Sequence, residues 1–371
     1  MGAREGMNID KKVIICSPGV NEHTMLHMLR HPDRSIYINA HKLGLVRSTD
    51  EGESWTQIPL NFTDATPNQD PGGFGITRDG RLWVVHQPLQ GDETDMFISC
   101  STDDGRSWKT RQVAFGHLSP GGADDPYVTA GVNRCYLNFL ERPDGTLMFS
   151  CSLRYADWMD YTQKDQSRPG IRDVMIRSTD GGKTWGDPTV VHQHATETQY
   201  AVDPADPDHI LAASRKQRQL LSGEDQATVE KLTGCEPGAG YPYKGGLLLE
   251  SIDGARSFHE VPDSYLGYYS HRATILWTGN NVVLVTHQNE EGALLARISL
   301  DGGKTWLDGT MNGTPAISNS KGFVMTDDHS FPAPTVELAV DHFLTACVSQ
   351  GNVEGFFWHI ERDSDGIGLN N

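Results

Sequence analysis

The stretch RSTDGGKTW, residues 177–185, carries an aspartate, a glycine, a hydroxyl residue and a tryptophan at fixed offsets. The pattern S-x-D-x-G-x-[S/T]-W recurs along the chain. The clean copies are STDEGESW (48–55), STDDGRSW (101–108), STDGGKTW (178–185) and SLDGGKTW (299–306), and SIDGARSF (251–258) is a degenerate copy. The pattern is typical of a tight turn. Its polar side chains bond nearby backbone groups, its glycine adopts a conformation closed to other residues, and its aromatic ring packs beneath.

The residues before each copy repeat as well. A short β-rich run such as GLVR or DVMIR leads into the turn, and a hairpin such as ITRDGRLWVVHQ or LERPDGTLMFSCS precedes that run. Such strand–turn–strand patterns predict antiparallel hairpins. A sixth unit ends in GFFWHIERDSDG (355–366), with a degraded turn. Six four-stranded antiparallel sheets set radially form a six-bladed β-propeller, so the predicted fold class is all-β.

The domain organisation follows from the repeat. We expect one propeller domain over residues 8–371, because no Ser/Gly/Pro linker divides the chain, with residues 1–7 as a leader. The sixth unit has little chain after its turn, so the run KKVIICS (11–17) is predicted to supply its fourth strand and close the ring. The best helix candidate, SGEDQATVEKLTG (222–234), is predicted to be an insertion in the fourth blade.

Composition limits the partners. The formal net charge of −18 argues against nucleic acid or an anionic membrane surface, since both require a basic face. The apolar runs are too short for a membrane span, and the six cysteines show neither a CxxC pair nor zinc spacing. We therefore expect no cofactor and no metal. Without a signal-peptide core the default location is cytoplasmic, and a trimmed signal peptide would make the protein secreted or periplasmic. The sequence leaves the oligomeric state open.

The repeated turn resembles the Asp-box, or BNR, repeat of the sialidase (neuraminidase) superfamily, and the resemblance covers essentially the whole chain. It implies a sialidase-like propeller. In that family the Asp box lies on the blade rim, away from the active site. The resemblance therefore implies a structural role for the aspartates of the five turns, which are Asp50, Asp103, Asp180, Asp253 and Asp301.

Candidate site residues follow from the repeat alignment, because ligands of propellers usually lie where the inner strands converge on the central channel. The starts of the inner strands would bring charged or aromatic side chains to this mouth: His23, Arg134, Glu197, Tyr269, His271, Arg272 and His329. The ends of the second strands would add a further set: His41, His86, Arg154, Arg215 and His287.

Roles for these residues come from the resemblance. Sialidases clamp a carboxylate with three arginines and use a Tyr–Glu pair as nucleophile and an aspartate as acid/base. Glu197 matches the family glutamate, and Arg215 and Arg272 match two of the arginines. Histidines stand near the other positions: His23 for the first arginine, His41 in the acid/base loop and His329 for the tyrosine. The predicted catalytic residues are Glu197, His23, His41, Tyr269 and His329, and the predicted substrate-binding residues are Arg215, Arg272, His86, His287, Arg154, Arg134 and His271.

The chemistry of this set fits an acidic sugar. Arginines bind a carboxylate or sulfate by charge-assisted bonds, and histidines transfer protons near neutral pH. The leading hypothesis is an exo-glycosidase acting on a terminal sialic acid, another 2-keto acid or a uronate. The alternatives are a polysaccharide lyase that uses His and Tyr, and a non-catalytic propeller that binds glycan or protein. His86 and His287 occupy equivalent repeat positions, so packing is an alternative for both, and Arg154 has Asp157 as an alternative partner.

Overall fold

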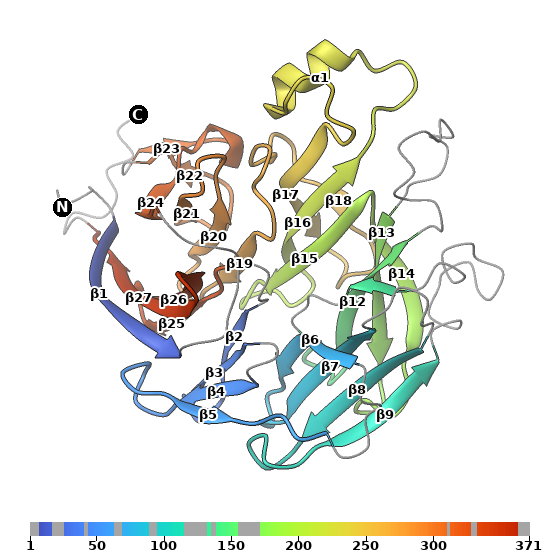
Figure 1. Ribbon diagram of the computed structural model, residues 1–371, viewed down its shortest axis with the longest axis vertical. Coiled ribbons are helices and arrows are strands. Elements are labelled where there is room, and N and C mark those ends of the chain that lie inside the picture. The colour runs from blue at the N-terminus through green and yellow to red at the C-terminus, as the bar shows by residue number, and fades with distance from the viewer. Residues whose placement is uncertain are drawn as a thin grey trace.

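The computed structural model describes residues 7–16, 26–40, 44–62, 69–88, 95–114, 132–134, 139–154, 171–309, 312–327 and 332–362. In this part of the chain, six antiparallel sheets stand around a common axis and one α-helix lies outside them (Figure 1). The predicted six-bladed all-β propeller is confirmed. No helix in the same ranges is long and apolar enough to cross a membrane.

The first three blades take up the N-terminal half of the chain. Blade one contains β2 (His27–Arg30), β3 (Ile36–Asn39), β4 (Leu45–Ser48) and β5 (Thr56–Ile58). Blade two contains β6 (Gln69–Ile76), β7 (Leu82–Pro88), β8 (Asp95–Ser101) and β9 (Lys109–Ala114). In blade three, β10 (Val132–Arg134) and β11 (Leu140–Glu141) both pair with β12 (Leu147–Arg154), followed by β13 (Ile171–Ser178) and β14 (Gly186–Gln193).

The other three blades complete the ring. Blade four contains β15 (Ala195–Val202), β16 (Ile210–Arg218), β17 (Tyr243–Ser251) and β18 (His259–Glu260). Blade five contains β19 (Thr274–Trp277), β20 (Val283–Gln288), β21 (Leu294–Ser299) and β24 (Phe323–Thr326), with the small β22–β23 pair (Trp306–Leu307 and Gly313–Thr314) and a 3-10 turn (Ile317–Asn319) before β24. Blade six contains β25 (Thr335–Ala339), β26 (His342–Ser349), β27 (Asn352–Ile360) and β1 (Met7–Cys16).

The ring closes through the two ends of the chain. β1 pairs antiparallel with β27, from Met7 opposite Ile360 to Cys16 opposite Val353, and the two strands lie side by side in Figure 1. The strand starts four residues before the predicted run 11–17 and ends at Cys16. Met7 is 3% exposed and packs into the apolar cluster of blades five and six. Met7, expected in the leader, is therefore part of blade six.

The helix insertion is confirmed. α1 (Gln226–Thr233) lies between β16 and β17 in blade four. Asp225 caps its start by accepting a hydrogen bond from the Thr228 backbone N–H at 2.8 Å, and Gly234 ends it with a φ of +71°. The helix starts later than residue 222 because the residues before Asp225 form a turn stabilised by Glu224, which accepts from the Leu221 backbone N–H at 2.7 Å.

The five repeated turns, called the Asp turns below, share one set of hydrogen bonds. In the third copy, Ser178 Oγ donates to Asp180 at 2.8 Å, and the N–H groups of Gly182 and Thr184 donate at 2.9 Å to Ser178 Oγ and Asp180. The other copies, including the degenerate one, repeat these three bonds. Each aspartate is therefore occupied in folding its own turn.

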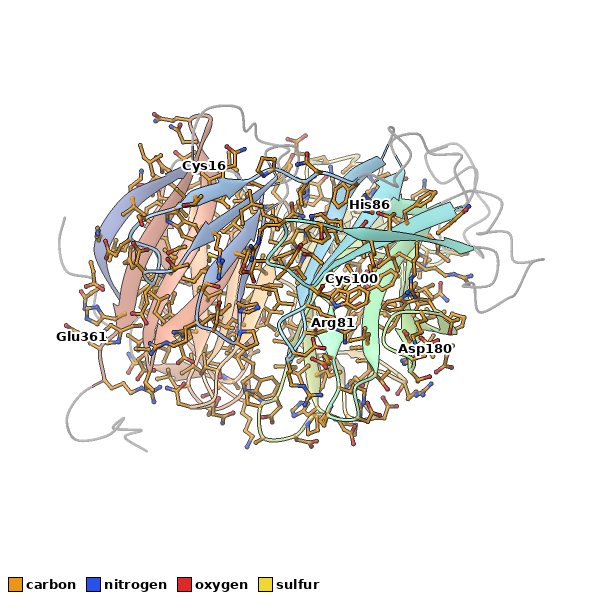
Figure 2. All side chains as sticks on the ribbon, turned by 90° about the horizontal axis from the view of Figure 1, so that it is seen from below. Cys16, Arg81, His86, Cys100, Asp180 and Glu361 are labelled. Carbon is orange, nitrogen blue, oxygen red and sulfur yellow. The ribbon has the colours of Figure 1, made fainter. Side chains whose placement is uncertain are left out.

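The Asp turns lie on one face of the ring. In Figure 2 Asp180 and Arg81 lie toward one face, while His86, near the end of β7, lies toward the other. We call the face of the Asp turns the turn face. The mouth face carries the ends of the second strands, such as His86 on β7 and Arg215 on β16, and the starts of the inner strands, such as Glu197 on β15. The Asp turns therefore stand opposite the candidate site.

Neighbouring blades pack through large apolar side chains. Between blades two and three the rings of Trp83 and Phe139 stack with centroids 5.6 Å apart, and Trp185 of the third Asp turn lies edge-on to both. Gly182 approaches Trp83 so closely that a Cβ there would lie 2.2 Å from the indole ring. The glycine of the repeat thus meets both a turn requirement and a packing requirement.

The described cysteines are all free thiols: Cys16, Cys100, Cys151, Cys235 and Cys347. Burial raises the pKa of the Cys100 thiol to about 11, so it is protonated at neutral pH. These residues contribute packing volume to the blades.

Candidate active site on the mouth face

Glu197 lies in a distortion of the innermost strand of blade four. The register of β15 against β16 shifts between Thr196 and Gln199, so Glu197 and Thr198 form a bulge. Glu197 has a φ of +58°, a left-handed conformation that costs a non-glycine residue about 1–2 kcal/mol. Bulges re-aim side chains, and such strained residues concentrate at functional sites. The glutamate side chain is almost completely buried.

Two arginines meet the carboxylate of Glu197. Arg215 Nη1 donates to Glu197 Oε1 at 2.9 Å, and Arg272 Nε lies 3.5 Å from the same oxygen. Arg215 comes from β16, whereas Arg272 comes from the loop between β18 and β19 and has a φ of +51°. The structure thus brings together three of the predicted site residues from separate segments.

The loop that carries Arg272 is held against the start of β17 by backbone contacts. Leu266 N donates to Gly246 O at 2.8 Å, Gly246 N donates to Ser270 Oγ at 2.7 Å, and Tyr269 N donates to Lys244 O at 3.2 Å. A Cβ on Gly245 would lie 2.0 Å from Gly267 O. Because Gly245 and Gly246 have no side chains, the loop can lie directly on the strand. This contact positions Arg272 next to Glu197.

Tyr269 and His271 belong to the same loop. Tyr269 is 37% exposed, has a φ of +67° and lies edge-on to Tyr268, with ring centroids 4.5 Å apart. Burial, reinforced by the charge of Arg215, lowers the pKa of His271 to about 3. His271 is therefore a neutral imidazole at physiological pH.

Lys244 is a site residue that the sequence analysis missed. It lies at the start of β17, and its register partner Gln217 is two residues beyond Arg215, which pairs with Gly246. Lys244 and Arg215 are thus diagonal neighbours on one face of the sheet. Burial and then the charge of Arg215 lower the pKa of Lys244, and the charge of Glu197 partly opposes this. The sequence KGG (244–246) could have indicated this position, because it places the lysine next to the two glycines on which the loop packs.

Asp173, on β13 of blade three, is the second residue that was missed. Its buried carboxylate accepts hydrogen bonds from Ser152 and Thr198. Burial raises the pKa of Asp173 to about 7, and the charge of Glu197 adds to the effect. Further hydroxyl contacts, Ser152 with Thr196 and Thr198 with Ser214, are both 2.8 Å long. The network holds the residues on either side of Glu197. The signal was a lone acid in the apolar run IRDVMIR (171–177).

His86 and His287 are used inside their own blades. His86 is fully buried, lies 2.6 Å from Ser99 Oγ and packs edge-on against Phe62, and burial lowers its pKa to about 4. His287 is also buried and accepts a hydrogen bond from Arg297 Nε at 2.8 Å. Burial, with the charge of Arg297, lowers the pKa of His287 to about 3. These contacts match the packing alternative, and none of them supports a role in substrate binding.

The remaining predicted site residues cannot be placed against Glu197. His23, His41 and His329 lie outside the described residues. The backbones of Arg134 and Arg154 belong to β10 and β12, and their side chains lie outside what the structure describes. Their roles stay predictions. Within the described ranges no group of three or more His, Cys, Asp and Glu residues could hold a metal ion.

A pocket of about 400 Å³ occupies the central channel. It is lined by inner-strand residues from five blades, among them His27, Leu140, Tyr200, Ile275 and Glu337. Residues 199–202 of β15 line it, beginning two residues after Glu197 on the same strand. The strand that carries Glu197 thus also borders the central pocket.

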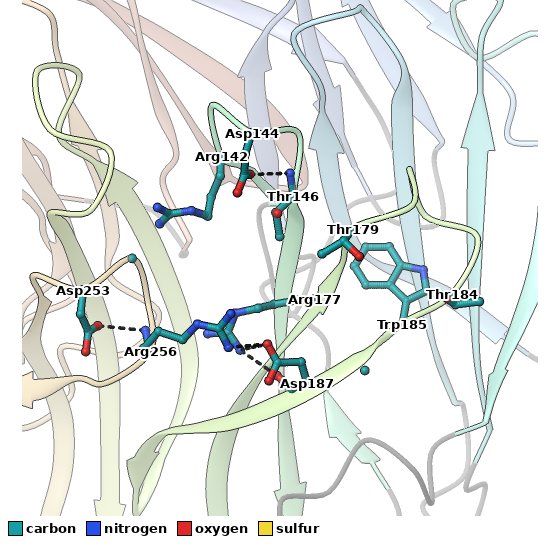
Figure 3. Close-up of a pocket in the computed structure, with 12 residues that line it drawn as sticks. Arg142, Asp144, Thr146, Arg177, Thr179, Thr184, Trp185, Asp187, Asp253 and Arg256 are labelled. Carbon is teal, nitrogen blue, oxygen red and sulfur yellow. Dashed lines mark hydrogen bonds and ion pairs between the residues drawn. The ribbon is translucent and has the colours of Figure 1, made fainter.

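A second pocket of about 410 Å³ lies on the turn face, between the Asp turns of blades three and four (Figure 3). Arg177 reaches across it and donates to Asp187 O at 2.7 Å, to Thr189 Oγ1 at 3.1 Å and to Ala255 O. Arg256 pairs with Asp187, and Arg142 pairs with Asp208. The arginines of this pocket are already paired, so they act as clamps between the blades.

Comparison with known proteins identifies the architecture. No protein-family model and no curated protein sequence matches the chain. Among solved structures, a protein of unknown function from Dyadobacter fermentans has a TM-score of 0.60 at 16% identity, covering 96% of this chain and 100% of its own. The Hadza microbial sialidase Hz136 has a TM-score of 0.59 at 13% identity, covering 93% of this chain and 66% of its own. The fold is a sialidase-like propeller.

The same propeller also resembles the α-L-arabinofuranosidase Arb93A from Fusarium graminearum, with a TM-score of 0.58 at 12% identity. That match covers 94% of this chain and 97% of the other. Because these identities are low, the similarity establishes the fold of the sialidase-like propeller, and its chemistry has to be argued from the residues on the mouth face.

Proposed function

We propose that the protein is a glycoside hydrolase that releases a terminal acidic sugar. Arg215 and Arg272 bind the anionic group of the sugar, and Glu197 acts at the anomeric carbon. The observation that carries this proposal is the meeting of one buried, strained carboxylate with two arginines on the mouth face, 2.9 Å and 3.5 Å away.

The local charge supports an anionic substrate. The chain has a formal net charge of −18, yet Arg215, Arg272 and Lys244 surround the single carboxylate of Glu197. The two arginine side chains are only 13% and 11% exposed. Cations taken out of water are costly unless an anion neutralises them. Arg215 and Lys244 repel each other, and an acidic sugar would bring a negative charge that attracts both.

The surroundings of Glu197 also indicate its role. Two guanidinium groups stabilise the negative charge of its carboxylate, which keeps it ionised as a nucleophile that faces an oxocarbenium-like transition state requires. The hydroxyl of the exposed Tyr269 belongs to the same loop as Arg272 and is the proposed partner of Glu197. The proton for the leaving group is assigned to His41, which the sequence places in the acid/base loop.

The solved structures with this fold are consistent with the proposal. They include proteins named as a sialidase and an α-L-arabinofuranosidase, both enzymes that cleave glycosidic bonds. The cations near Glu197 favour an acidic sugar over a neutral pentose, because they can form charge-assisted hydrogen bonds with its anionic group.

The experiment that tests this proposal is mass spectrometry of the products formed from sialosides and uronate-containing oligosaccharides. Release of a sugar with one added water, abolished in Glu197→Gln, is the expected result. An unsaturated fragment without added water would make the enzyme a lyase and overturn hydrolysis. An unchanged mass on every substrate would leave a binding propeller.

A further inference from the structure

The charge of Lys244 has no partner among the residues that the structure describes. Its side chain is half-buried, and within the described chain its ammonium forms neither a hydrogen bond nor an ion pair. The neighbouring Lys216, on the adjacent strand β16, differs: its Nζ lies 2.6 Å from Glu260 Oε1. In the described part of blade four, Lys216 thus has an acidic partner and Lys244 has none.

The position of Lys244 is fixed by contacts on both sides. On one side, the backbone of Lys244 pairs with Gln217 in β16. On the other side, Lys244 O accepts a hydrogen bond from the Tyr269 backbone N–H at 3.2 Å. Arg215 is its diagonal neighbour on the sheet, and the charges of Arg215 and Glu197 both act on the ammonium. Lys244 therefore stands beside Arg215, and its backbone contacts the exposed Tyr269 of the loop.

An unpaired ammonium next to a second cation is unfavourable in the free protein. Partial burial removes water from the charge, and Arg215 repels it. A ligand with a negative group relieves both effects at once, because it pairs with Lys244 and screens it from Arg215. The arrangement resembles a binding site prepared for an anion more than a structural ion pair.

We propose that Lys244 binds the anionic group of the substrate directly, as a third cation beside Arg215 and Arg272. This proposal rests on the proposed function for the identity of the sugar, but the anion subsite itself is defined by the residues. The lysine extends the recognition surface from β16 to β17. It selects a sugar acid over the corresponding amide or neutral sugar.

The first test does not depend on catalysis. Sodium sulfate is added to the wild-type protein, Lys244→Met and Lys231→Met, with sodium chloride at matched ionic strength as the reference, and the unfolding midpoint is recorded. Lys231 is an exposed lysine of α1 and serves as the control. Sulfate should raise the midpoint of the wild type and the Lys231 variant more than that of Lys244→Met. An equal response of all three proteins would overturn the proposal.

The second test uses the sugar acid that the wild type hydrolyses. Lys244→Met should raise KM about tenfold to a hundredfold while kcat is largely kept, and Lys244→Arg should recover part of the loss. An unchanged KM in Lys244→Met would overturn the proposal while hydrolysis stands. If the wild type hydrolyses no acidic sugar but sulfate binding depends on Lys244, the proposed function fails and the anion subsite stands.

Discussion

Arg215 Nη1 donates to Glu197 Oε1 at 2.9 Å, and this bond ties the second strand of blade four to the bulge in its innermost strand. Arg272 reaches the same oxygen from the loop toward blade five. Glu197 is therefore both the candidate catalytic group and the counter-ion of the two arginines. Substitutions at this residue have to be judged by stability as well as by activity.

Replacing Glu197 with Gln should abolish turnover of the acidic sugar, by at least about a hundredfold in kcat/KM, because the amide is neither nucleophile nor base. It should also lower the free energy of unfolding by about 3 kcal/mol, since two buried arginines lose their counter-ion. Rate assays and urea unfolding measure the two effects. Glu250→Gln, which removes a carboxylate that pairs with His209 and His259, is the control and should keep full activity. Normal turnover by a folded Glu197→Gln would exclude a catalytic role.

Asp173→Asn should change how stability depends on pH. The folded pKa of Asp173, about 7, lies above the ordinary aspartate value of 3.8, so the contribution of this group is fully present below pH 4 and is lost as pH rises toward 7. The loss amounts to at most about 4 kcal/mol at 1.36 kcal/mol per pKa unit. The asparagine variant lacks this loss, so its stability relative to wild type should rise between pH 4 and pH 8.

Urea unfolding at several pH values measures the difference between Asp173→Asn and wild type. Asp144→Asn is a control of opposite sign, because the bonds from Thr146 lower the pKa of this exposed carboxyl. A difference that does not vary with pH would show that Asp173 is ionised throughout the range.

Gly182→Ala should destabilise the protein more than Gly181→Ala. Both glycines have a positive φ, +83° and +72°, which costs an alanine about 1–2 kcal/mol. At Gly182 the added Cβ would also lie 2.2 Å from Trp83, and overpacking of this kind adds about 1–3 kcal/mol. At Gly181 the nearest atom is 3.8 Å away. Thermal unfolding of the pair isolates the packing contribution, and equal midpoints would contradict it.

Arg177→Met should weaken the contact between blades three and four. The guanidinium donates to the carbonyls of Asp187 and Ala255 and to Thr189 Oγ1, and a methionine removes this donor from the buried Ala255 carbonyl and from two partly buried acceptors. We expect a loss of about 2–3 kcal/mol in the free energy of unfolding, measured in urea. Arg106→Met, at a side chain that is 74% exposed, is the matched control. Activity on the mouth face should persist in folded Arg177→Met.

The propeller could be predicted because its decisive signal is local. Ser178, Asp180, Gly182 and Thr184 make all the bonds of their turn within seven residues, so the pattern in the sequence is the pattern in space. The hairpins are local as well. The start of β1 was missed because the burial of Met7 depends on residues of blades five and six, which no local pattern reveals.

The candidate site could be predicted only in part. The repeat marks strand starts and ends, and this allowed Glu197, Arg215 and Arg272 to be predicted on one face, where the structure brings them into contact. Lys244 was missed because its place depends on the loop that packs on Gly245 and Gly246, a tertiary contact. His86 and His287 illustrate the converse, because an equivalent repeat position indicates packing as readily as it indicates a shared site.

The pairing of β1 with β27 has a consequence for biosynthesis. β1 is synthesised long before its partner strand, since Met7 lies opposite Ile360, 353 residues further along the chain. β1 must therefore wait, unpaired, until β27 has been translated, while the other blades can form in order. Contacts of such long range slow folding, and an unpaired strand edge invites association with other chains. Nascent chains that stall before β27 should therefore be the species that need chaperones most.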